Sequence, residues 1–371
     1  MGLIKLSFNE DIEKKIKETG IDLNAVRESG LYVQVNDDIV KTIIVKQLEK
    51  KGIIVKRLGD ALDEFPWVKD YLWRAIGVKK GGGASEDEKV KNGYFIYVPP
   101  NTRVDTPIEA CFLVTKPGHI QEVHNLVIVD ENSSIEMVTG CTAAISEGLH
   151  LGISEFFVKK NARLLFTMLH NWTPNFKVRP ITKIIVEENG EYIENYINLA
   201  PGAWMKANPH IKLMKNARAH SQSLIIGRGG TNIDYGSTME LLGDGSRGDI
   251  VSRVMTFDES KIVSRGKIIA IGKNTAGHIE CKGLMMSEES SIHAIPELVT
   301  KTVDANLTHE ASIGKISKEQ IEYLMARGFT EDEATGLIIR GFMNIELKGV
   351  NEAVKKTVLG ILDKISKSEG M

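Results

Sequence analysis

Short apolar runs separated by polar turn residues fill the middle of the chain. Examples are "LVIVDENSSIEM", "FFVKKNARLLFTML", "KIIVEENGEYIENYI" and "IKLMKNARAHSQSLII". Apolar positions at helical spacing are not sustained over long windows here, and each run has the length of a strand. The pattern therefore predicts many short β-strands connected by tight turns.

The turns recur at a nearly constant spacing. Turn pairs that contain Asn or Gly begin at positions 131, 160, 188, 215, 244 and 273, so the successive differences are 29, 28, 27, 29 and 29. Weaker turn signals lie roughly midway between them. Asn, Asp and Gly tolerate the left-handed backbone of tight turns, and a fixed period of this length is typical of a solenoid. We predict a mainly β fold with a right-handed parallel β-helix over residues 95–315; a meandering antiparallel barrel is the alternative.

Both ends of the chain differ from this middle part. Residues 37–77 carry apolar positions at helical spacing, and the Gly-rich, charged stretch 78–93 is predicted to be a mobile linker. Residues 1–94 are therefore expected to form an N-terminal helical region that ends in the linker.

The C-terminal residues 316–371 are expected to form a helical domain. Two capping boxes, "SKEQ" from Ser317 and "TEDE" from Thr330, predict the starts of two helices, and a third is predicted in "NEAVKKTVLGILDKI" from residue 351. Apolar positions at a spacing of three and four form stripes on the first two helices. These stripes either pack on the β-helix or form a docking surface for a partner.

Composition and charge exclude several classes of function. The chain has 371 residues and a net charge of −2, which argues against a nucleic-acid binder because such proteins usually carry a basic excess. No apolar run approaches the roughly 18 residues of a membrane span, and charge returns early in "MGLIKLSFNEDIEKK", so no signal peptide is expected. We expect a cytoplasmic protein. Its three cysteines form no C-x-x-C pair, so neither a disulfide framework nor a self-sufficient zinc site is expected.

One group of residues is a candidate metal site. The step from Cys281 to His309 is 309 − 281 = 28, which is one predicted coil, and Glu310 follows directly. Residues one coil apart stack at about 4.8 Å, and a thiolate favours zinc or iron–sulfur species over harder cations. In the other interpretation Cys281 is a core residue, His309 caps a turn and Glu310 is solvated. Three ligands are also one short of a closed site, which implies an open position, a second chain or transient loading.

Residues next to Cys281 and several absent motifs refine this hypothesis. His278 and Glu280 lie at alternate strand positions and are expected on the face opposite Cys281. No phosphate-binding P-loop, G-x-S-x-G elbow or H-E-x-x-H motif is present. The paired acids lie in turns, so a polysaccharide-cleaving β-helix has little support. The chain is not expected to hydrolyse nucleotide itself.

Several segments resemble the SufB/SufD family of iron–sulfur cluster assembly scaffolds. They are "HIECKGLMM", "LTHEASIGKI", "EQIEYLMARGFTEDEATGLIIRGF", "GCTA" at 140–143 and "HNW" at 170–172. The resemblance covers about residues 95–365 and implies a right-handed β-helix flanked by helical domains. Cys281, His309 and Glu310 match the cysteine and the His-Glu pair of SufB, which implies that they bind metal and the cluster. SufD lacks the cysteine, so the chain is more similar to SufB.

The resemblance also implies a function and partners. The chain would build a transient cluster and transfer it to apoproteins without enzymatic activity of its own. The nuclearity of the cluster is left open, with [4Fe-4S] favoured. ATP would be hydrolysed by a SufC-like ABC ATPase bound to the C-terminal helices, and a separate donor would supply sulfur. A homodimer through the last strands, near residues 295–313, is expected. The alternative is a SufD-like adaptor that binds the ATPase without holding a cluster.

Three features depart from SufB. Thr308 stands where SufB often has Glu, Val158 stands where some members carry a sulfur-accepting cysteine, and the N-terminal region is short. The resemblance is therefore closest to a compact, archaeal-type scaffold that pairs with itself.

Overall fold

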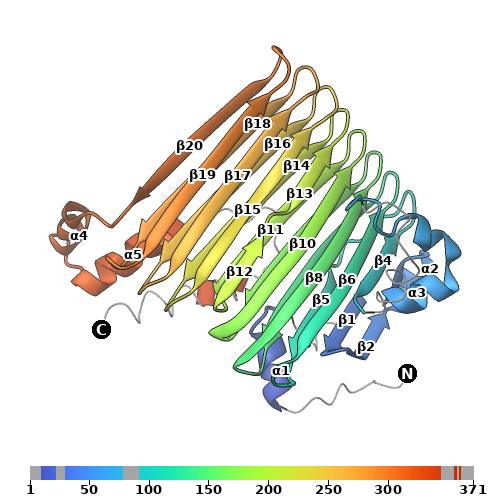
Figure 1. Ribbon diagram of the computed structural model, residues 1–371, viewed down its shortest axis with the longest axis horizontal. Helices are drawn as coiled ribbons and strands as arrows, with labels where there is room; N and C mark the ends of the chain where they lie inside the picture. The colour runs from blue at the N-terminus through green and yellow to red at the C-terminus, as the bar shows by residue number, and fades with distance from the viewer. Residues whose placement is uncertain (1–9, 22–29, 78–91, 344–354, 357–358, 361–371) are drawn as a thin grey trace.

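The fold is a stack of parallel β-coils with helices at both ends (Figure 1). The computed structural model describes residues 10–21, 30–77, 92–343, 355–356 and 359–360. Most of the predicted linker and most of the third C-terminal helix lie outside these residues. The described strands form a parallel solenoid of about eight turns, which confirms the predicted solenoid over the antiparallel barrel.

Each coil contributes one strand to each of two sheets. The first sheet has the order β2 (Asp38–Ile44), β1 (Gly30–Val35), β5 (Ile108–Val114), β7 (Ser134–Ala143), β9 (Arg163–Asn171), β11 (Glu191–Ala200), β14 (Arg218–Gly227), β16 (Arg247–Thr256), β18 (Ala276–Met285) and β20 (Asn306–Gly314). The second has the order β19 (Ser291–Thr300), β17 (Lys261–Ala270), β15 (Asn232–Leu241), β12 (Trp204–Ala207), β10 (Asn175–Val186), β8 (Glu147–Val158), β6 (Ile120–Val129), β4 (Tyr94–Val98) and β3 (Ile54–Arg57), and β13 (His210–Leu213) pairs with β10 and β15. Only the β1–β2 and β3–β4 pairs are antiparallel among the described strands.

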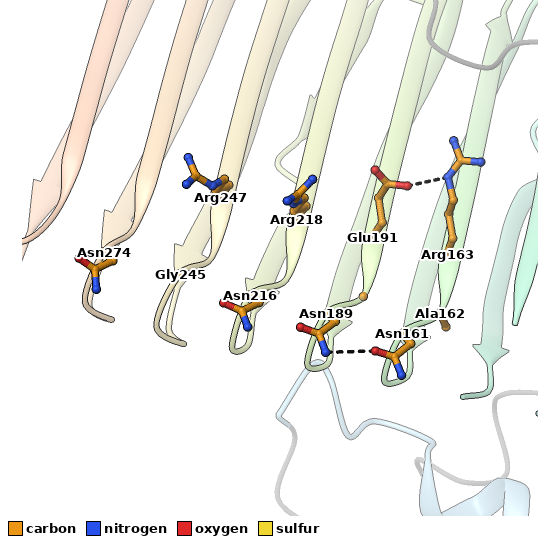
Figure 2. A pocket seen from close by; sticks show the side chains of 11 residues that line it. Asn161, Ala162, Arg163, Asn189, Glu191, Asn216, Arg218, Gly245, Arg247 and Asn274 are labelled. Atoms are coloured by element: carbon orange, nitrogen blue, oxygen red, sulfur yellow. Dashed lines mark hydrogen bonds and ion pairs between the residues drawn. The ribbon is translucent and has the colours of Figure 1, made fainter. Parts of the chain in front are cut away.

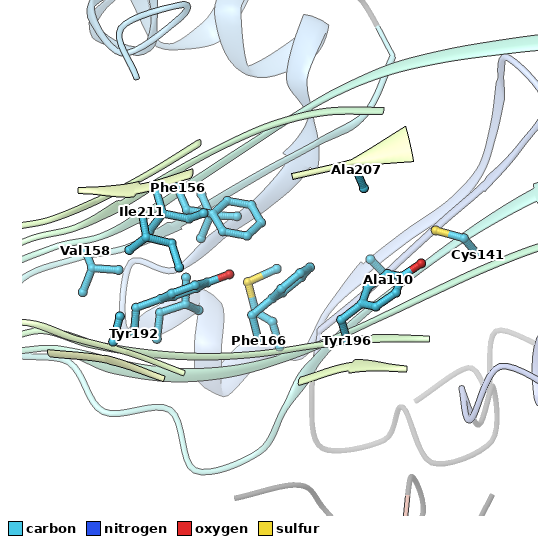
Figure 3. Close-up of a cluster of buried hydrophobic side chains, with 14 of the residues drawn as sticks. Ala110, Cys141, Phe156, Val158, Phe166, Tyr192, Tyr196, Ala207 and Ile211 are labelled. Carbon is cyan, nitrogen blue, oxygen red and sulfur yellow. The ribbon is translucent and has the colours of Figure 1, made fainter. Parts of the chain in front are cut away.

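The core lies between the two sheets. Alternate strand residues point inward, as the period-two burial of β16 and β17 shows. Figure 3 shows Phe156, Phe166 and Tyr192 filling the interior between opposing strands, and all three side chains are buried. Burying an aromatic or large aliphatic side chain contributes roughly 1.5–3 kcal/mol, so these rings, which meet edge-on or tilted, stabilise the contact between coils.

The sequence period arises from a ladder of turn asparagines. Asn132, Asn161, Asn189 and Asn216 all have φ between 55° and 58°, the left-handed region that Asn tolerates. The amide of Asn161 donates to the side-chain oxygen of Asn132 at 2.9 Å, and that of Asn189 donates to Asn161 at 3.1 Å. The ladder explains why turn residues alone predicted the coil length.

The N-terminal region is a mixture of helix and strand. Its helices are α1 (Glu10–Lys17), α2 (Lys46–Lys50), α3 (Leu58–Glu64) and the 3₁₀ segment η2 (Pro66–Asp70). The prediction of helix across residues 37–77 is wrong over β2 and β3. Ile43, Ile44 and Val55 are β-branched residues that favour a pleated strand, and β2 and β3 extend the two sheets and close the first coil.

The two predicted C-terminal helix starts are confirmed. In α4 (Lys318–Met325) the Ser317 side chain accepts from the backbone N–H of Gln320, and before α5 (Glu331–Met343) Thr330 and Glu333 form a reciprocal capping box at 2.9 and 3.2 Å. On α5, Ile339 and Met343 are buried in a cluster with outward-facing residues of the first sheet. The helix therefore covers part of the solenoid wall. Among the described residues, no helix is long and apolar enough to cross a membrane.

Candidate functional site

Cys281 lies on the inner face of β18, and one further strand, β20, follows β18 in the first sheet. Its side chain is 3% exposed. Ser252 pairs with Cys281 in register, and Ser264 of the second sheet forms a hydrogen bond with it from across the interior. The two serine hydroxyls are 2.9 Å apart. The thiol therefore sits in a small polar environment inside an otherwise apolar coil.

The protonation of Cys281 follows from this environment. Burial raises the pKa of the thiol above its ordinary value, and nearby Glu280 acts in the same direction, whereas the Ser264 hydrogen bond and the charge of Arg253 oppose the shift. The thiol is thus protonated at neutral pH. A metal ion that binds there must displace the proton, because the thiolate is the ligand form.

His309 lies on the strand next to Cys281 but not directly opposite it. Ala276 pairs with Asn306, so the step between these two strands is 306 − 276 = 30, and Cys281 pairs with Ala311 while His309 pairs with Ile279. The prediction that His309 stacks one coil after Cys281 is therefore wrong by two positions. One cause is the turn at residues 286–290, which is one residue longer than the turn at 257–260 in the preceding coil. Cys281 and His309 remain diagonal neighbours on the inner face.

Glu310 lies on the outer face of the same sheet. It pairs in register with Glu280, and the Lys282 ammonium is 3.5 Å from Glu310 and 3.3 Å from Glu280. Arg253 forms a close ion pair with Glu280. Although partial burial opposes the shift, bonds with Arg253 and Lys282 lower the pKa of Glu280. The sequence interpretation missed this charged network, which only the strand register reveals.

The structure thus separates the three predicted ligands by face. Cys281 and His309 share the inner face, and Glu310 is on the other side of the sheet. His278 and Glu280 lie opposite Cys281, as predicted, and His278 contacts the Thr308 hydroxyl at 2.8 Å. Across the residues that the structure describes, no group of three or more His, Cys, Asp or Glu side chains is close enough to hold a metal ion.

Among the described residues, no further strand covers the C-terminal end of the solenoid. At the other end β2 and β3 terminate the two sheets with antiparallel pairs, whereas β19 and β20 are outermost at this end and β20 is exposed along nearly its whole length. His309, although on the inner face, is therefore exposed. An inward-facing histidine at an open edge is accessible to a ligand or to a second chain.

A second polar group lies deep in the interior and was not predicted. A cavity of about 40 Å³ is lined in part by Cys141, His150, His170 and Glu194. Burial lowers the pKa of His150 to about 4 and, together with the charge of His150, that of His170 to about 3. Burial raises the pKa of Glu194 to about 7, against the hydrogen bond that it accepts from Ser221. Cys141 is a free, buried thiol.

Glu194 makes stability depend on pH. Its folded-state pKa is about 7 against an ordinary 4.5, so its protonated form favours the folded state below pH 4.5, and this contribution is lost as the pH rises through 7. The loss reaches about 3 kcal/mol at pH 8. We expect Glu194→Gln to gain stability over the wild type at pH 8 but not at pH 4.5. Urea unfolding at both pH values measures this difference, and an equal difference at both would contradict it.

Comparison with known proteins places these features in a family. Residues 112–342 match the domain family described as "SUF system FeS cluster assembly, SufBD core domain". An "Iron-sulfur cluster assembly SufBD family protein" of Archaeoglobus fulgidus is 42% identical over 348 residues, covering 93% of each chain. A relative with the same description in Methanothermobacter thermautotrophicus is 36% identical over 95% of this chain and 88% of its own. Another, from Pyrococcus horikoshii, is 32% identical over 93% and 80%.

Proposed function

The chain belongs to the SufBD family of iron–sulfur cluster assembly proteins, and from this premise we propose that it is a SufB-like scaffold on which a transient cluster is built and passed to apoproteins. The observation that carries the proposal is the place of Cys281: a thiol with two serine neighbours at the end of the solenoid, one coil from an open edge. Anaerobic reconstitution with iron and sulfide, followed by absorption and Mössbauer spectroscopy, tests it.

The ligand set combines one soft and two harder donors. Cys281 supplies a thiolate, and His309 and Glu310 complete the ligation. Because Glu310 lies on the outer face and interacts with Lys282, it reaches a cluster near Cys281 of its own chain only if β20 shifts. A second copy of the chain is the alternative source. Ligation by a single thiolate leaves the cluster labile, which suits a scaffold that releases its product; [4Fe-4S] is the form that we favour.

The second copy is proposed to bind through β20. An exposed edge strand offers unpaired backbone donors and acceptors. In β19 the backbone N–H groups of Ser291 and Lys301 donate to the neighbouring coil, so the odd-numbered residues face that coil and the even-numbered residues face the free edge. Pro296 is one of the residues at the free edge, and a proline there removes a hydrogen-bond donor. β20 has no proline. Pairing of two β20 strands would give a homodimer with the two candidate sites near its axis.

An ABC-type ATPase of the SufC kind is the proposed partner of the C-terminal helices. Large apolar side chains are exposed on and beside α4 and α5: Tyr323 at 57%, Met325 at 43%, Phe329 at 40% and Leu337 at 41%. Of the predicted stripe, Ile321, Leu324, Ile338 and Phe342 are partly buried. An exposed apolar patch of this kind is typical of a protein interface. The partner would hydrolyse ATP, and the chain itself would have no enzymatic activity.

Substitutions in this patch test the proposal more specifically than a deletion of residues 317–371 would. Such a deletion would also expose the apolar outer face of the first sheet that α5 covers. We expect Met325→Asp with Leu337→Asp to abolish co-purification with the ATPase, because two charges would be buried without partners at the interface. Ile120→Asp is the matched control, since Ile120 is 54% exposed near the other end of the solenoid. Unchanged binding by the double variant would exclude this surface.

The SufD-like adaptor is the second candidate function. It is favoured by the burial of Cys281 and by the opposite orientation of Glu310. It also fits Val158, a buried apolar residue where some family members carry a sulfur-accepting cysteine. The sulfur donor of a scaffold would then have to reach the site by another route. Reconstitution separates the two, because an adaptor acquires no cluster.

A further inference from the structure

A groove runs along the turns at the start of the strands of the first sheet (Figure 2). Its volume is about 700 Å³. It crosses several coils and is lined by turn asparagines and by the first side chains of β9, β11, β14 and β16. These first side chains are Arg163, Glu191, Arg218 and Arg247.

The four side chains form one column across consecutive strands. Arg163 pairs in register with Glu191, Glu191 with Arg218, and Arg218 with Arg247. The Arg163 Nε donates to the Glu191 carboxylate at 2.6 Å. No side-chain hydrogen bond or ion pair joins Arg218 or Arg247 to any residue that the structure describes. Arg163 and Glu191 therefore neutralise each other, whereas Arg218 is followed in the column by a second positive charge, Arg247.

Two arginines in register on adjacent strands repel each other. The strand spacing is about 4.8 Å, guanidinium groups stay charged at all accessible pH, and like charges directly opposite each other are unfavourable. Glu191 cannot neutralise both, because its carboxylate is bound to Arg163. An anion placed between Arg218 and Arg247 would remove the repulsion.

The turn ladder is interrupted at the same place. Asn161 and Asn189 are linked by a side-chain hydrogen bond, but Gly245 occupies the next turn after Asn216 and has no side chain. The turn beside Arg247 therefore adds no side chain to the groove. A carboxylate that could neutralise Arg218 and Arg247 is likewise missing from their column.

We propose that Arg218 and Arg247 bind an oxyanion of the phosphate class. Each guanidinium can donate two parallel hydrogen bonds, so two of them require more acceptor oxygens than the two of a carboxylate. Phosphate and pyrophosphate meet this need, either free or as the end of a nucleotide. Arg247 and Cys281 lie on the neighbouring strands β16 and β18, with Arg247 five positions before Ser252, the residue that pairs with Cys281. The proposal does not depend on cluster assembly.

Calorimetric titration of the full-length protein with inorganic pyrophosphate at low salt tests the proposal. Arg218→Gln and Arg247→Gln are each expected to raise the dissociation constant at least about tenfold, since each removes charge-assisted hydrogen bonds. Arg179→Gln is the control, an exposed arginine on β10 of the other sheet, and should change affinity less than threefold. Binding should weaken when salt rises from about 50 to about 300 mM.

Titrations with phosphate and ADP separate the sources of the ligand. ADP that binds no more tightly than pyrophosphate indicates that only the phosphate groups are recognised, whereas tighter binding of ADP indicates a nucleotide; either result supports the site. The proposal is overturned if the wild type binds none of the three at millimolar concentration in low salt. It is equally overturned if Arg179→Gln weakens binding as much as Arg218→Gln.

Discussion

Replacing Cys281 by serine is expected to abolish cluster reconstitution while the fold is retained. Cys281 supplies the only thiolate of the proposed ligand set, and a hydroxyl is a poor ligand for iron–sulfur species. Serine is also tolerated locally, because Ser252 and Ser264 already form a hydrogen-bonded pair beside this position. The variant should therefore unfold at a similar denaturant concentration and still bind the ATPase, but its charge-transfer absorption after anaerobic reconstitution should disappear.

Two further variants test whether the effect is specific. Cys111 and Cys141 are buried and belong to earlier coils, so Cys111→Ala and Cys141→Ala should retain the iron–sulfur spectrum. A spectrum in Cys281→Ser equal to that of the wild type would eliminate the scaffold proposal and leave the adaptor. Loss of the spectrum in all three variants would indicate general damage to the fold instead of loss of a ligand.

Much of the fold could be predicted from the sequence because one local signal repeats. Each coil requires a left-handed residue at its turn, and Asn132, Asn161, Asn189 and Asn216 provide it at steps of 29, 28 and 27 along the chain. Solenoid coils interact mainly with their neighbours, so local spacing is nearly sufficient to define the stack. The N-terminal region lacks such a repeat, and there the strands β2 and β3 were mistaken for helix.

The candidate site was harder to predict because strand alternation depends on single-residue register. A shift of one residue moves a side chain to the other face of the sheet, and the last coil advances from Ala276 to Asn306, two positions more than the step from Cys281 to His309. Cys281 and His309 lie on the same face because these two steps differ by an even number of residues. Glu310 is the next residue after His309 and therefore lies on the other face. Register between strands also decides two other contacts. These are the ion pair between Lys282 and Glu310 and the alignment of Arg218 with Arg247. Turn spacing does not determine this register.

The open end of the solenoid leads to the last prediction. In β20 the N–H of Asn306 donates to the carbonyl of Thr275, just before β18, so alternate residues from Asn306 face the neighbouring strand. The N–H groups of Leu307, His309 and Ala311 therefore face the free edge. If two copies pair through this edge, Ala311→Pro removes one donor from each chain and leaves the bonds to β18 intact. Each dimer loses two hydrogen bonds, about 2–4 kcal/mol, so its dissociation constant should rise roughly 30- to 1,000-fold.

Ala294→Pro is the matched control, the same substitution at a free-edge position of β19, where Pro296 already limits pairing. Sedimentation equilibrium at micromolar concentration should give twice the 41.1 kDa chain mass for the wild type and Ala294→Pro, and the chain mass for Ala311→Pro. Circular dichroism should be the same for all three, because the edge N–H groups do not stabilise the isolated chain. A monomeric wild type, with and without the ATPase, would refute pairing through β20, and the Glu310 carboxylate would then have to reach any cluster within its own chain.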